Sequence, residues 1–248
     1  MSQIFDRADK VLVALGHFES RASAQAAIAA GKVSVSGKVL KKSSEKISPE
    51  ARIEAEPVHP WVSRSGLKLM HALETFEIDS SGAHCLDVGA STGGFSEVLL
   101  ARGAASIIAV DVGRDQLHAR LQGDPRVTSL EATDARTLTA EMVRQPPQLI
   151  VCDASFISLH KLLAVPLSLA ADEATLIALF KPQFEVGREH VGKGGIVSDN
   201  AAIARAEQSF IDWLGGEGWH VKGQTDSPIK GGDGNAERLI FAARAPLT

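Results

Sequence analysis

The segment Cys85–Ser96 reads CLDVGASTGGFS, a short apolar run that leads into a turn with three glycines, Gly89, Gly93 and Gly94. Short apolar runs are typical of buried strands, and glycine lets the backbone approach a ligand closely. The segment therefore predicts a strand that turns tightly into a helix at a binding site for a nucleotide-type cofactor. A strand–helix turn without any ligand is the simpler alternative.

Apolar runs alternate with helical patterns from residue 82 onward. The strands predicted from these runs are HCLDV, SIIAVDV, RVTSLE, QLIVCDA and ATLIALFKP, with WHVKGQT and ERLIFAAR as two further candidates. Helical patterns occupy FSEVLLARG, DQLHARLQG and residues 199–214. Such alternation is typical of a doubly wound sheet. The predicted fold class is α/β, with a Rossmann-like, mostly parallel seven-stranded sheet flanked by helices.

The glycine pattern differs from two common phosphate-binding motifs. The dinucleotide fingerprint requires a second glycine where Ser91 stands, and a P-loop requires a lysine that this turn lacks. The segment GREHVGK at 187–193 is similar to a P-loop, but Gly194 replaces the hydroxyl residue that would hold Mg²⁺. S-adenosylmethionine fits the remaining pattern, because it carries a ribose, an adenine and an amino acid but no pyrophosphate.

Four aspartates stand at or near the carboxyl ends of predicted strands, where ligands bind in such sheets. We expect Asp111 to accept hydrogen bonds from the ribose hydroxyls, and Asp87, or a water it holds, to meet the ammonium group. Asp134 is expected to reach the adenine amine. The predicted cofactor-binding residues are Asp87, Gly89, Ala90, Ser91, Gly93, Gly94, Phe95, Asp111, Val112, Asp134 and Asp153.

The first 70 residues are basic and the rest of the chain is acidic. They hold 11 Lys/Arg and 7 Asp/Glu, a net charge of +4, which leaves 15 and 23 in residues 71–248, a net charge of −8. Residues 7–15 and 20–30 show helical spacing, and KVSVSGKVL is typical of a hairpin. We predict a small α+β domain over residues 1–56, a linker over residues 57–63 and a second domain over residues 64–248.

The pattern R-x-D…SR-x-x-A…I-x-x-G-x-V-x-V-x-G-K over residues 5–56 resembles the S4-type RNA-binding domain. The resemblance implies that this domain holds structured RNA through its phosphates. A basic face that is merely solvated is the alternative. The predicted RNA-binding residues are Arg7, Lys10, Arg21, Lys32, Lys38, Lys41 and Lys42.

Longer runs extend the resemblance over nearly the whole chain. They are WVSRSGLKL, CLDVGASTGGFSEVLLARGA, VDVGRDQL, CDASFISL, LFKPQFEVGREHVGKGGIVSD and GNAERLIFA. Together they resemble the TlyA-type family, also labelled haemolysin A, whose catalytic domain is similar to the FtsJ-like RNA methyltransferases. The resemblance implies S-adenosylmethionine-dependent 2′-O-methylation of cytidine ribose in ribosomal RNA, with ribosomal RNA or ribosomal subunits as the partner.

The catalytic set implied by this resemblance is Lys68, Asp153, Lys181 and Glu237. A ribose hydroxyl must lose its proton as it attacks a sulfonium methyl group, and a desolvated lysine can take that proton. A lysine that stays charged can instead orient the hydroxyl and stabilise the developing alkoxide. Asp153 would position Lys181, while Lys68 and Glu237 would hold the substrate ribose. For any one of these residues alone, a surface ion pair is the alternative.

Composition restricts the other classes of function. Cys85 and Cys152 lie in apolar runs, which indicates buried free thiols and a reducing compartment, here the cytoplasm. The apolar runs are shorter than the roughly 18 residues of a membrane span, and the first residues lack a signal-peptide pattern. The histidines show no metal-ligand spacing, so we expect no metal. We also expect no membrane contact, and we expect the protein to be a monomer. A membrane-lytic protein and a non-catalytic ribosome-assembly factor are the alternative functions.

Two further features stand near the predicted site. Phe95, Phe156 and Phe184 flank it, and core packing is the favoured interpretation, with stacking on a base or on adenine as the alternative. The glycine-rich segment GREHVGKGGIVSD at 187–199 is interpreted either as a substrate-side lid or as a flexible loop.

Overall fold

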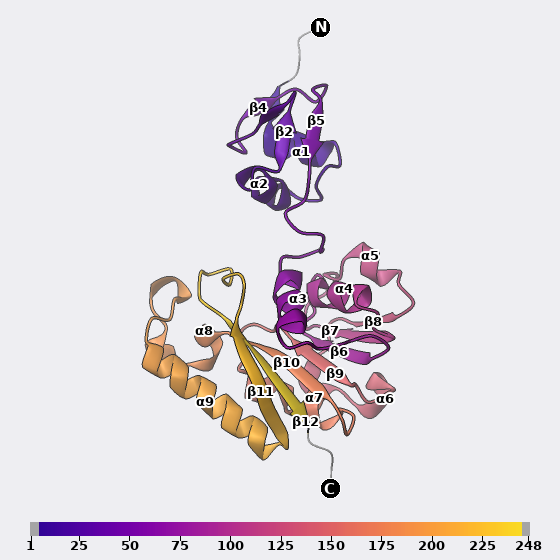
Figure 1. Ribbon diagram of the computed structural model, residues 1–248, viewed down its shortest axis with the longest axis vertical. Coiled ribbons are helices and arrows are strands. Elements are labelled where there is room, and N and C mark those ends of the chain that lie inside the picture. Colours follow the sequence, from indigo (N-terminus) through magenta and orange to yellow (C-terminus); the bar gives the residue numbers. More distant parts are fainter. Residues whose placement is uncertain (1–4, 245–248) are drawn as a thin grey trace. The chain divides into compact units, whose positions relative to one another are not determined.

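The computed structural model describes residues 5–244, and the chain divides into two compact units, Met1–Pro60 and Trp61–Thr248 (Figure 1). The division falls inside the segment 57–63 that the sequence predicts as a linker. Each unit has its own hydrophobic core, and the two are described separately below.

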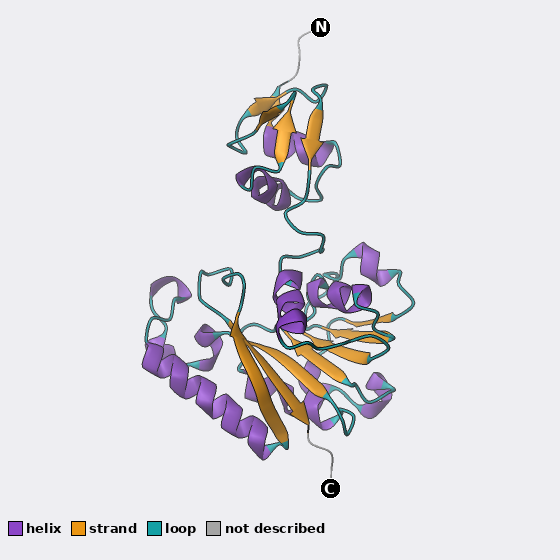
Figure 2. Cartoon of the chain, in the orientation of Figure 1, coloured by secondary structure: helices purple, strands orange, loops and turns teal. Residues whose placement is uncertain are grey.

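The first unit combines two helices with short antiparallel strands (Figure 2). Its elements are β1 (Asp6–Arg7), α1 (Ala8–Ala14), α2 (Arg21–Ala29), β2 (Val33–Val35), β3 (Lys38–Val39), β4 (Lys46–Ile47) and β5 (Ile53–Ala55). Ser20 and Ser23 form a capping box that starts α2, as the sequence indicates. The predicted helices and hairpin are present, whereas β4 and β5 were not predicted, because both are too short to show a period of two.

The second unit is built on a sheet in the order β11-β12-β10-β9-β6-β7-β8. Its strands are β6 (His84–Val88), β7 (Ser106–Val110), β8 (Val127–Leu130), β9 (Leu149–Cys152), β10 (Thr175–Phe180), β11 (Trp219–Asp226) and β12 (Arg238–Arg244). The five strands from β10 to β8 run parallel, whereas β12 is antiparallel to both β10 and β11. The mostly parallel seven-stranded sheet predicted from the sequence is confirmed within residues 61–244.

Helices connect these strands. They are α3 (Gly66–Thr75), α4 (Gly94–Ala101), α5 (Ala119–Gln122), α6 (Ala140–Val143), α7 (Leu159–Ser168), α8 (Pro182–Glu185) and α9 (Asn200–Gly216), with the 3-10 turns η1 (Ala135–Thr137), η2 (Arg188–His190) and η3 (Lys193–Gly195). Of these, α4, α5 and α9 were predicted, although α5 is shorter than DQLHARLQG. The sequence analysis missed α3, α7 and the four-residue helices α6 and α8.

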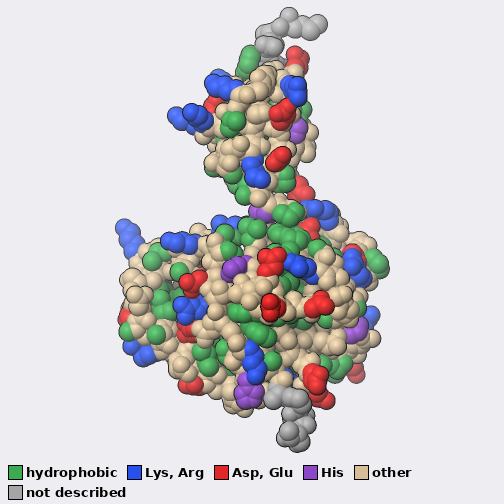
Figure 3. Space-filling view, in the orientation of Figure 1, with side chains coloured by type: hydrophobic (Ala, Val, Ile, Leu, Met, Phe, Trp, Pro, Cys, Tyr) green, Lys and Arg blue, Asp and Glu red, His purple; other side chains and the backbone are tan. Residues whose placement is uncertain are grey.

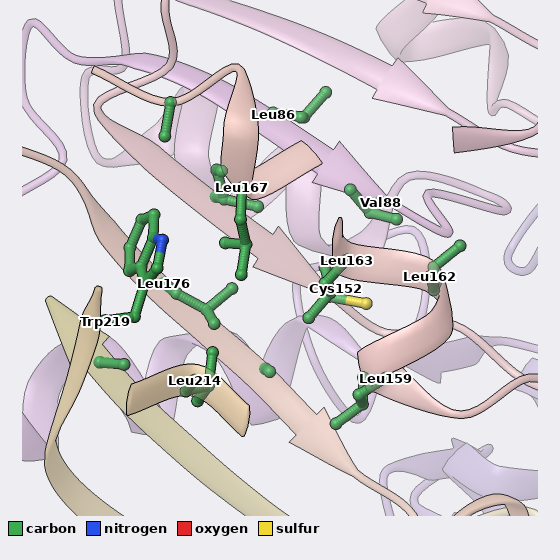
Figure 4. Close-up of a cluster of buried hydrophobic side chains, with 14 of the residues drawn as sticks. Leu86, Val88, Cys152, Leu159, Leu162, Leu163, Leu167, Leu176, Leu214 and Trp219 are labelled. Carbon is green, nitrogen blue, oxygen red and sulfur yellow. The ribbon is translucent and has the colours of Figure 1, made fainter. Parts of the chain in front are cut away.

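Both faces of the sheet are covered, as strand β10 shows. Leu176, Ala178 and Phe180 pack with α7 and α9, whereas Ile177 and Leu179 pack with α3 and α4 on the other face. Figure 4 shows part of the first of these clusters, with Trp219 beside Leu214. Because both faces are covered, the central strands are mostly apolar on both faces. Each fully buried leucine or isoleucine contributes about 1.5–3 kcal/mol relative to exposure.

The sheet brings two kinds of strand ends to one edge. The carboxyl ends of β6, β7, β9 and β10 meet there because these strands are parallel. Antiparallel β12 starts at the same edge, since Arg238 pairs with Phe180. The residue before β12 therefore reaches the edge where parallel sheets bind ligands.

Candidate active site

The turn after β6 depends on glycine at two positions. Gly89 and Gly93 have φ angles of 80° and 93°, in the left-handed region that favours glycine. A Cβ atom on Gly89 would lie 2.9 Å from the Ala154 Cα atom. Glycine at this position therefore lets the turn after β6 lie directly against the turn after β9.

A cavity of about 430 Å³ lies beside this turn, and Asp111 stands in its wall. Asp111 Oδ2 accepts a hydrogen bond from the Ser91 backbone N–H at 2.8 Å, and Oδ1 accepts one from Gly113 at 2.7 Å. Each carboxylate oxygen has two lone pairs, so each can also accept from a ligand hydroxyl. The position suits the predicted contact with a ribose.

Asp87 is fully buried at the end of β6. Its Oδ2 accepts a hydrogen bond from Ser96 Oγ at 2.7 Å, whereas Oδ1 has no hydrogen-bond partner within the described part of the chain. Burial raises the pKa of Asp87 to about 7, and the negative charges of Asp153 and Asp111 raise it further. An unpaired buried carboxyl oxygen near other acids is the environment that a cationic ligand group relieves.

These observations test the predicted cofactor. Three acids at the ends of β6, β7 and β9 suit a ligand with an ammonium, a sulfonium and a ribose diol, and the glycine turn permits its close approach. The residues present therefore fit S-adenosylmethionine.

A second cavity of about 340 Å³ adjoins the first and contains all four predicted catalytic residues in its wall. Lys181 Nζ lies 2.6 Å from Asp153 Oδ1, 3.0 Å from Ser155 Oγ and 3.4 Å from the Asp153 carbonyl oxygen. Across the cavity, Lys68 Nζ forms an ion pair with Glu237.

The four residues come from separate parts of the second unit. Lys68 lies on α3, Asp153 follows β9, Lys181 follows β10 and Glu237 precedes β12. Their side chains are at most 14% exposed. Buried ion pairs add little net stability compared with apolar residues of the same size. Two such pairs in one cavity therefore indicate a functional site rather than a structural one.

The two cavities share part of their walls. Gly89, Ser91, Asp153, Ser155 and Phe156 line both of them. A donor molecule in the first cavity and an acceptor in the second would consequently meet beside the Lys181–Asp153 pair.

Comparison with known proteins identifies the family. Residues 61–244 match the FtsJ-like methyltransferase family, and residues 6–53 match the S4 domain. The 16S/23S rRNA (cytidine-2′-O)-methyltransferase TlyA of Mycobacterium tuberculosis is 43% identical over 95% of this chain and 88% of its own length. The chain belongs to the TlyA family of FtsJ-like methyltransferases.

Two further TlyA-family relatives support this assignment. Hemolysin A of Brachyspira hyodysenteriae is 38% identical over 94% of this chain and 98% of its own length. A solved hemolysin-type structure from Streptococcus thermophilus is 35% identical, with a TM-score of 0.76 over 99% of this chain and 91% of that one. The predicted family, the fold class with its S4 domain, the class of enzyme and its cofactor S-adenosylmethionine are confirmed.

Asp134, a predicted cofactor contact of this TlyA-family protein, pairs with Arg136. Asp134 caps η1 and binds Arg136, whose Nη2 lies 2.6 Å from Asp134 Oδ2. Its neighbours Thr133 and Ala135 line the first cavity instead. The guanidinium of Arg136 lowers the pKa of Asp134 and keeps it ionised. A contact between Asp134 and adenine stays a prediction, and it would compete with the Arg136 pair.

The predicted glycine turn is joined to other elements. The Ala90 carbonyl accepts a hydrogen bond from Gly93 at 2.8 Å, and Gly94 begins α4. A Cβ atom on Gly94 would lie 2.2 Å from Ser65 Oγ, so the turn packs closely on the segment before α3. Val112 is 71% exposed at the rim of the first cavity.

Sequence reasoning missed several residues in the cavity walls. Ser155 accepts a hydrogen bond from Lys181, and Arg64 and Gln183 line the second cavity. Ser155 and Gln183 each stand two residues after a predicted catalytic residue, in CDAS and KPQ. Side chains two apart on an extended segment share a face, and this spacing could have identified Ser155. It does not apply to Gln183, which lies in helix α8.

The three aromatic residues differ from one another. Phe95 is 2% exposed in the core beneath α4, which agrees with core packing. For Phe156 the core prediction is wrong, because this ring is 91% exposed on a backbone with φ of 68°. Its centroid lies 5.1 Å from that of Phe184, and both rings line the second cavity.

The glycine-rich segment 187–199 is held to its neighbours by hydrogen bonds. Buried Asn235 accepts from the Val197 backbone N–H at 3.0 Å and donates to the Gly195 carbonyl at 2.8 Å. His190 lies 3.0 Å from Asp199, which caps α9. The segment is thereby tied to the loop that carries Glu237. Whether it acts as a substrate-side lid or as a flexible loop stays a prediction.

The predicted RNA-binding residues of the first unit fall into two groups. Arg7 and Arg21 are half-exposed and bind the fully buried carboxylate of Asp9, which also accepts a hydrogen bond from Gln25 at 2.6 Å. These contacts, from Arg7 above all, hold the pKa of Asp9 well below its usual range. The lysines are exposed, and Figure 3 shows Lys and Arg side chains on the surface of this unit. They are Lys10, Lys32, Lys38, Lys41 and Lys42.

Three other expectations concern single residue classes. Cys85 and Cys152 are buried free thiols, as predicted, and burial raises the pKa of each to about 12. Among residues 5–244 there is no group of three or more His, Cys, Asp or Glu side chains placed to hold a metal ion. Within the same residues, every helix is too short or too polar to span a membrane.

Proposed function

We propose that the protein methylates the 2′-hydroxyl of cytidine ribose in ribosomal RNA, with S-adenosylmethionine as the methyl donor. The observation that carries this proposal is the Lys181–Asp153 pair in the shared wall of the two cavities. The TlyA relatives bear names that describe this reaction. When bound, the cofactor supplies an electrophilic methyl group on a sulfonium.

Lys181 acts on the attacking oxygen. The hydroxyl oxygen bonds to the methyl carbon, the carbon–sulfur bond breaks, and the hydroxyl proton must leave. As a neutral amine Lys181 accepts that proton, and as an ammonium it orients the hydroxyl and stabilises the developing negative charge. Asp153 and Ser155 fix its position through the three contacts given above.

The Lys68–Glu237 pair holds the acceptor ribose on the other side of the cavity. A lysine donates and a carboxylate accepts, so together they can bind adjacent sugar hydroxyls. Alignment of the reacting atoms supplies much of the rate in such transfers, and two fixed pairs provide it.

Phe156 stacks on a base of the substrate. An exposed ring with an aromatic neighbour at a cavity mouth suits a base that has left its helix. Stacking of a base on an aromatic side chain is worth about 1–3 kcal/mol.

The S4-type domain, predicted over residues 1–56, docks the enzyme on ribosomal RNA, and residues 57–63 link it to the catalytic domain. Its exposed lysines bind phosphates, while Asp9 fixes the two half-exposed arginines in place. A ribosomal substrate requires that the protein act in the cytoplasm. That it acts as a monomer stays a prediction.

The test is methyl transfer from tritiated S-adenosylmethionine to ribosomal subunits. Lys181→Ala should lower the turnover rate at least about a hundredfold, because a charge at the reacting oxygen is lost. Its affinity for S-adenosylhomocysteine should stay close to that of the parent protein. Lys161→Ala, at an exposed lysine on α7, is the matched control.

Other outcomes would select other functions. Equal turnover by Lys181→Ala would remove Lys181 from the mechanism. Cofactor binding by the parent protein without turnover on any ribosomal particle would favour an assembly factor, and leakage of liposomes at the same protein concentration would favour a membrane-lytic protein.

A further inference from the structure

The segments that leave β9 and β10 contact each other at three successive points. Lys181 binds Asp153 and Ser155 at the first point, and the ring of Phe184 packs on that of Phe156 at the second. At the third, Glu185 Oε1 accepts a hydrogen bond from the Leu159 backbone N–H at 2.9 Å. The first two contacts belong to the site described above, whereas the third lies behind it.

The third contact satisfies the first N–H group of helix α7. Helix α7 has ten residues, and Ser158 at its N-cap makes no capping hydrogen bond with its side chain within residues 5–244. The first N–H groups of a helix need acceptors, and an N-cap side chain serves the second or third helical residue rather than the first. The N–H of Leu159, the first residue of α7, finds its acceptor in Glu185, 26 residues later in the chain.

The carboxyl of Glu185 lies in an environment that disfavours a charge. Burial raises its pKa to about 7, and the Leu159 N–H offsets only part of this effect. Burying a polar group costs free energy unless the group is hydrogen-bonded, so the carboxyl of Glu185 depends on its bond to Leu159. A side-chain cap at residue 158 would stabilise the same helix end through the next N–H groups, but it would not join the two segments.

We propose that Glu185 is a positioning residue for methyl transfer, which ties the start of α7 to the segment after β10. Its hydrogen bond keeps the loop with Asp153, Ser155 and Phe156 in register with Lys181. This inference rests on the proposed function, because it assigns a role within the same reaction. Glu185 itself contacts neither substrate nor cofactor in this role.

The experiment uses the full chain and compares two substitutions. Glu185→Ala removes the link, and we expect its kcat to fall about tenfold or more, since small misplacements of reacting groups are costly. Its affinity for S-adenosylhomocysteine should change less than threefold. Glu185→Gln keeps an oxygen acceptor and should restore most of kcat. Glu173→Gln, at the exposed opposite end of β10, is the control for the lost charge.

A second-site variant separates positioning from helix capping. Ser158→Asp supplies a local cap for α7. In the Glu185→Ala background it should recover thermal stability and slow hydrogen exchange in α7, yet leave kcat low. Recovery of kcat by this double variant would show that Glu185 is only a cap, and would overturn the proposal.

Two further results would also overturn it. One is a kcat of Glu185→Ala that stays within twofold of the parent value. The other is a Glu185→Gln variant as slow as Glu185→Ala, because the hydrogen bond would then not be the link. Failure of the parent protein to methylate any ribosomal particle would instead refute the proposed function, and is recognised by the parent measurement alone.

Discussion

Asp9 in the first unit and Asp87 in the second are both fully buried, yet their surroundings are opposite. Asp9 is surrounded by donors from Arg7, Arg21 and Gln25, which lower its pKa. Asp87 has Ser96 as a donor, an unpaired Oδ1 among the described residues, and a pKa raised to about 7. The first carboxylate is satisfied by the protein itself, whereas we propose that a ligand completes the second.

Replacing each aspartate with asparagine tests this comparison, and we expect the larger effect in the first unit. Asp9→Asn leaves two guanidiniums without their buried charge, so the small unit should open more often. We expect amide hydrogen exchange across residues 5–55 to become roughly a hundredfold faster, as for other broken buried pairs. Exchange in the second unit is the internal control. Unchanged exchange in residues 5–55 would mean that Asp9 does not hold the unit together.

Asp87→Asn should instead leave the stability of the second unit intact and weaken cofactor binding. The neutral amide replaces a carboxyl that burial already disfavours, so the melting temperature should not fall. Affinity for S-adenosylmethionine should fall about tenfold, because the charge that meets the ammonium is lost. Isothermal titration measures this affinity, with Asp172→Asn at an exposed position as the control. A destabilised variant with unchanged affinity would assign Asp87 to the fold instead.

The smallest expected effect is on the pH dependence of the free energy of unfolding. Between about pH 4 and pH 7, folded protein keeps a proton on Asp87 that the unfolded chain has lost, so stability decreases as pH rises through this range. Glu185 acts in the same direction. From pH 6 to pH 7.5 we expect Asp87 to lower the free energy of unfolding by about 1 kcal/mol. Denaturant titrations should show a weaker pH dependence for Asp87→Asn, and equal curves would contradict this account.

Asp9 gives stability the opposite dependence on pH, in a more acidic range. Its pKa is lowered in the folded state, so its contribution is present above pH 4 and disappears as the pH falls further. Asp87 should therefore stabilise the second unit as the pH falls from 7 to 4, whereas Asp9 should destabilise the first unit only below pH 4, and hydrogen exchange can follow both region by region.

The sequence predicted the sheet well because its central strands form nearly continuous apolar runs. Strand β10 illustrates this, since both of its faces are covered. Helix α7 escaped prediction because Pro166 interrupts its pattern, and α3 because it was assigned only as the motif WVSRSGLKL. The direction of β12 could not be predicted, because an apolar residue pattern does not distinguish a parallel strand from an antiparallel one.

The site was predicted unevenly for similar reasons. The acids at strand ends follow from the rule for parallel sheets. Lys68 and Glu237 are 169 residues apart, and only the family resemblance joined them before the structure did. Phe156 was wrongly assigned to the core, because exposure of an aromatic ring depends on a local backbone angle that its neighbours do not reveal. The link from Glu185 to Leu159 has no sequence pattern at all.

The place of β12 has a consequence for biosynthesis. This strand leaves the ribosome after every other described strand, yet it lies between β10 and β11 in the finished sheet, and Glu237 directly precedes it. A nascent chain that ends at residue 230 has neither the strand nor the partner of Lys68. Because Glu237 belongs to the proposed catalytic set, we expect a chain truncated at residue 230 to be inactive.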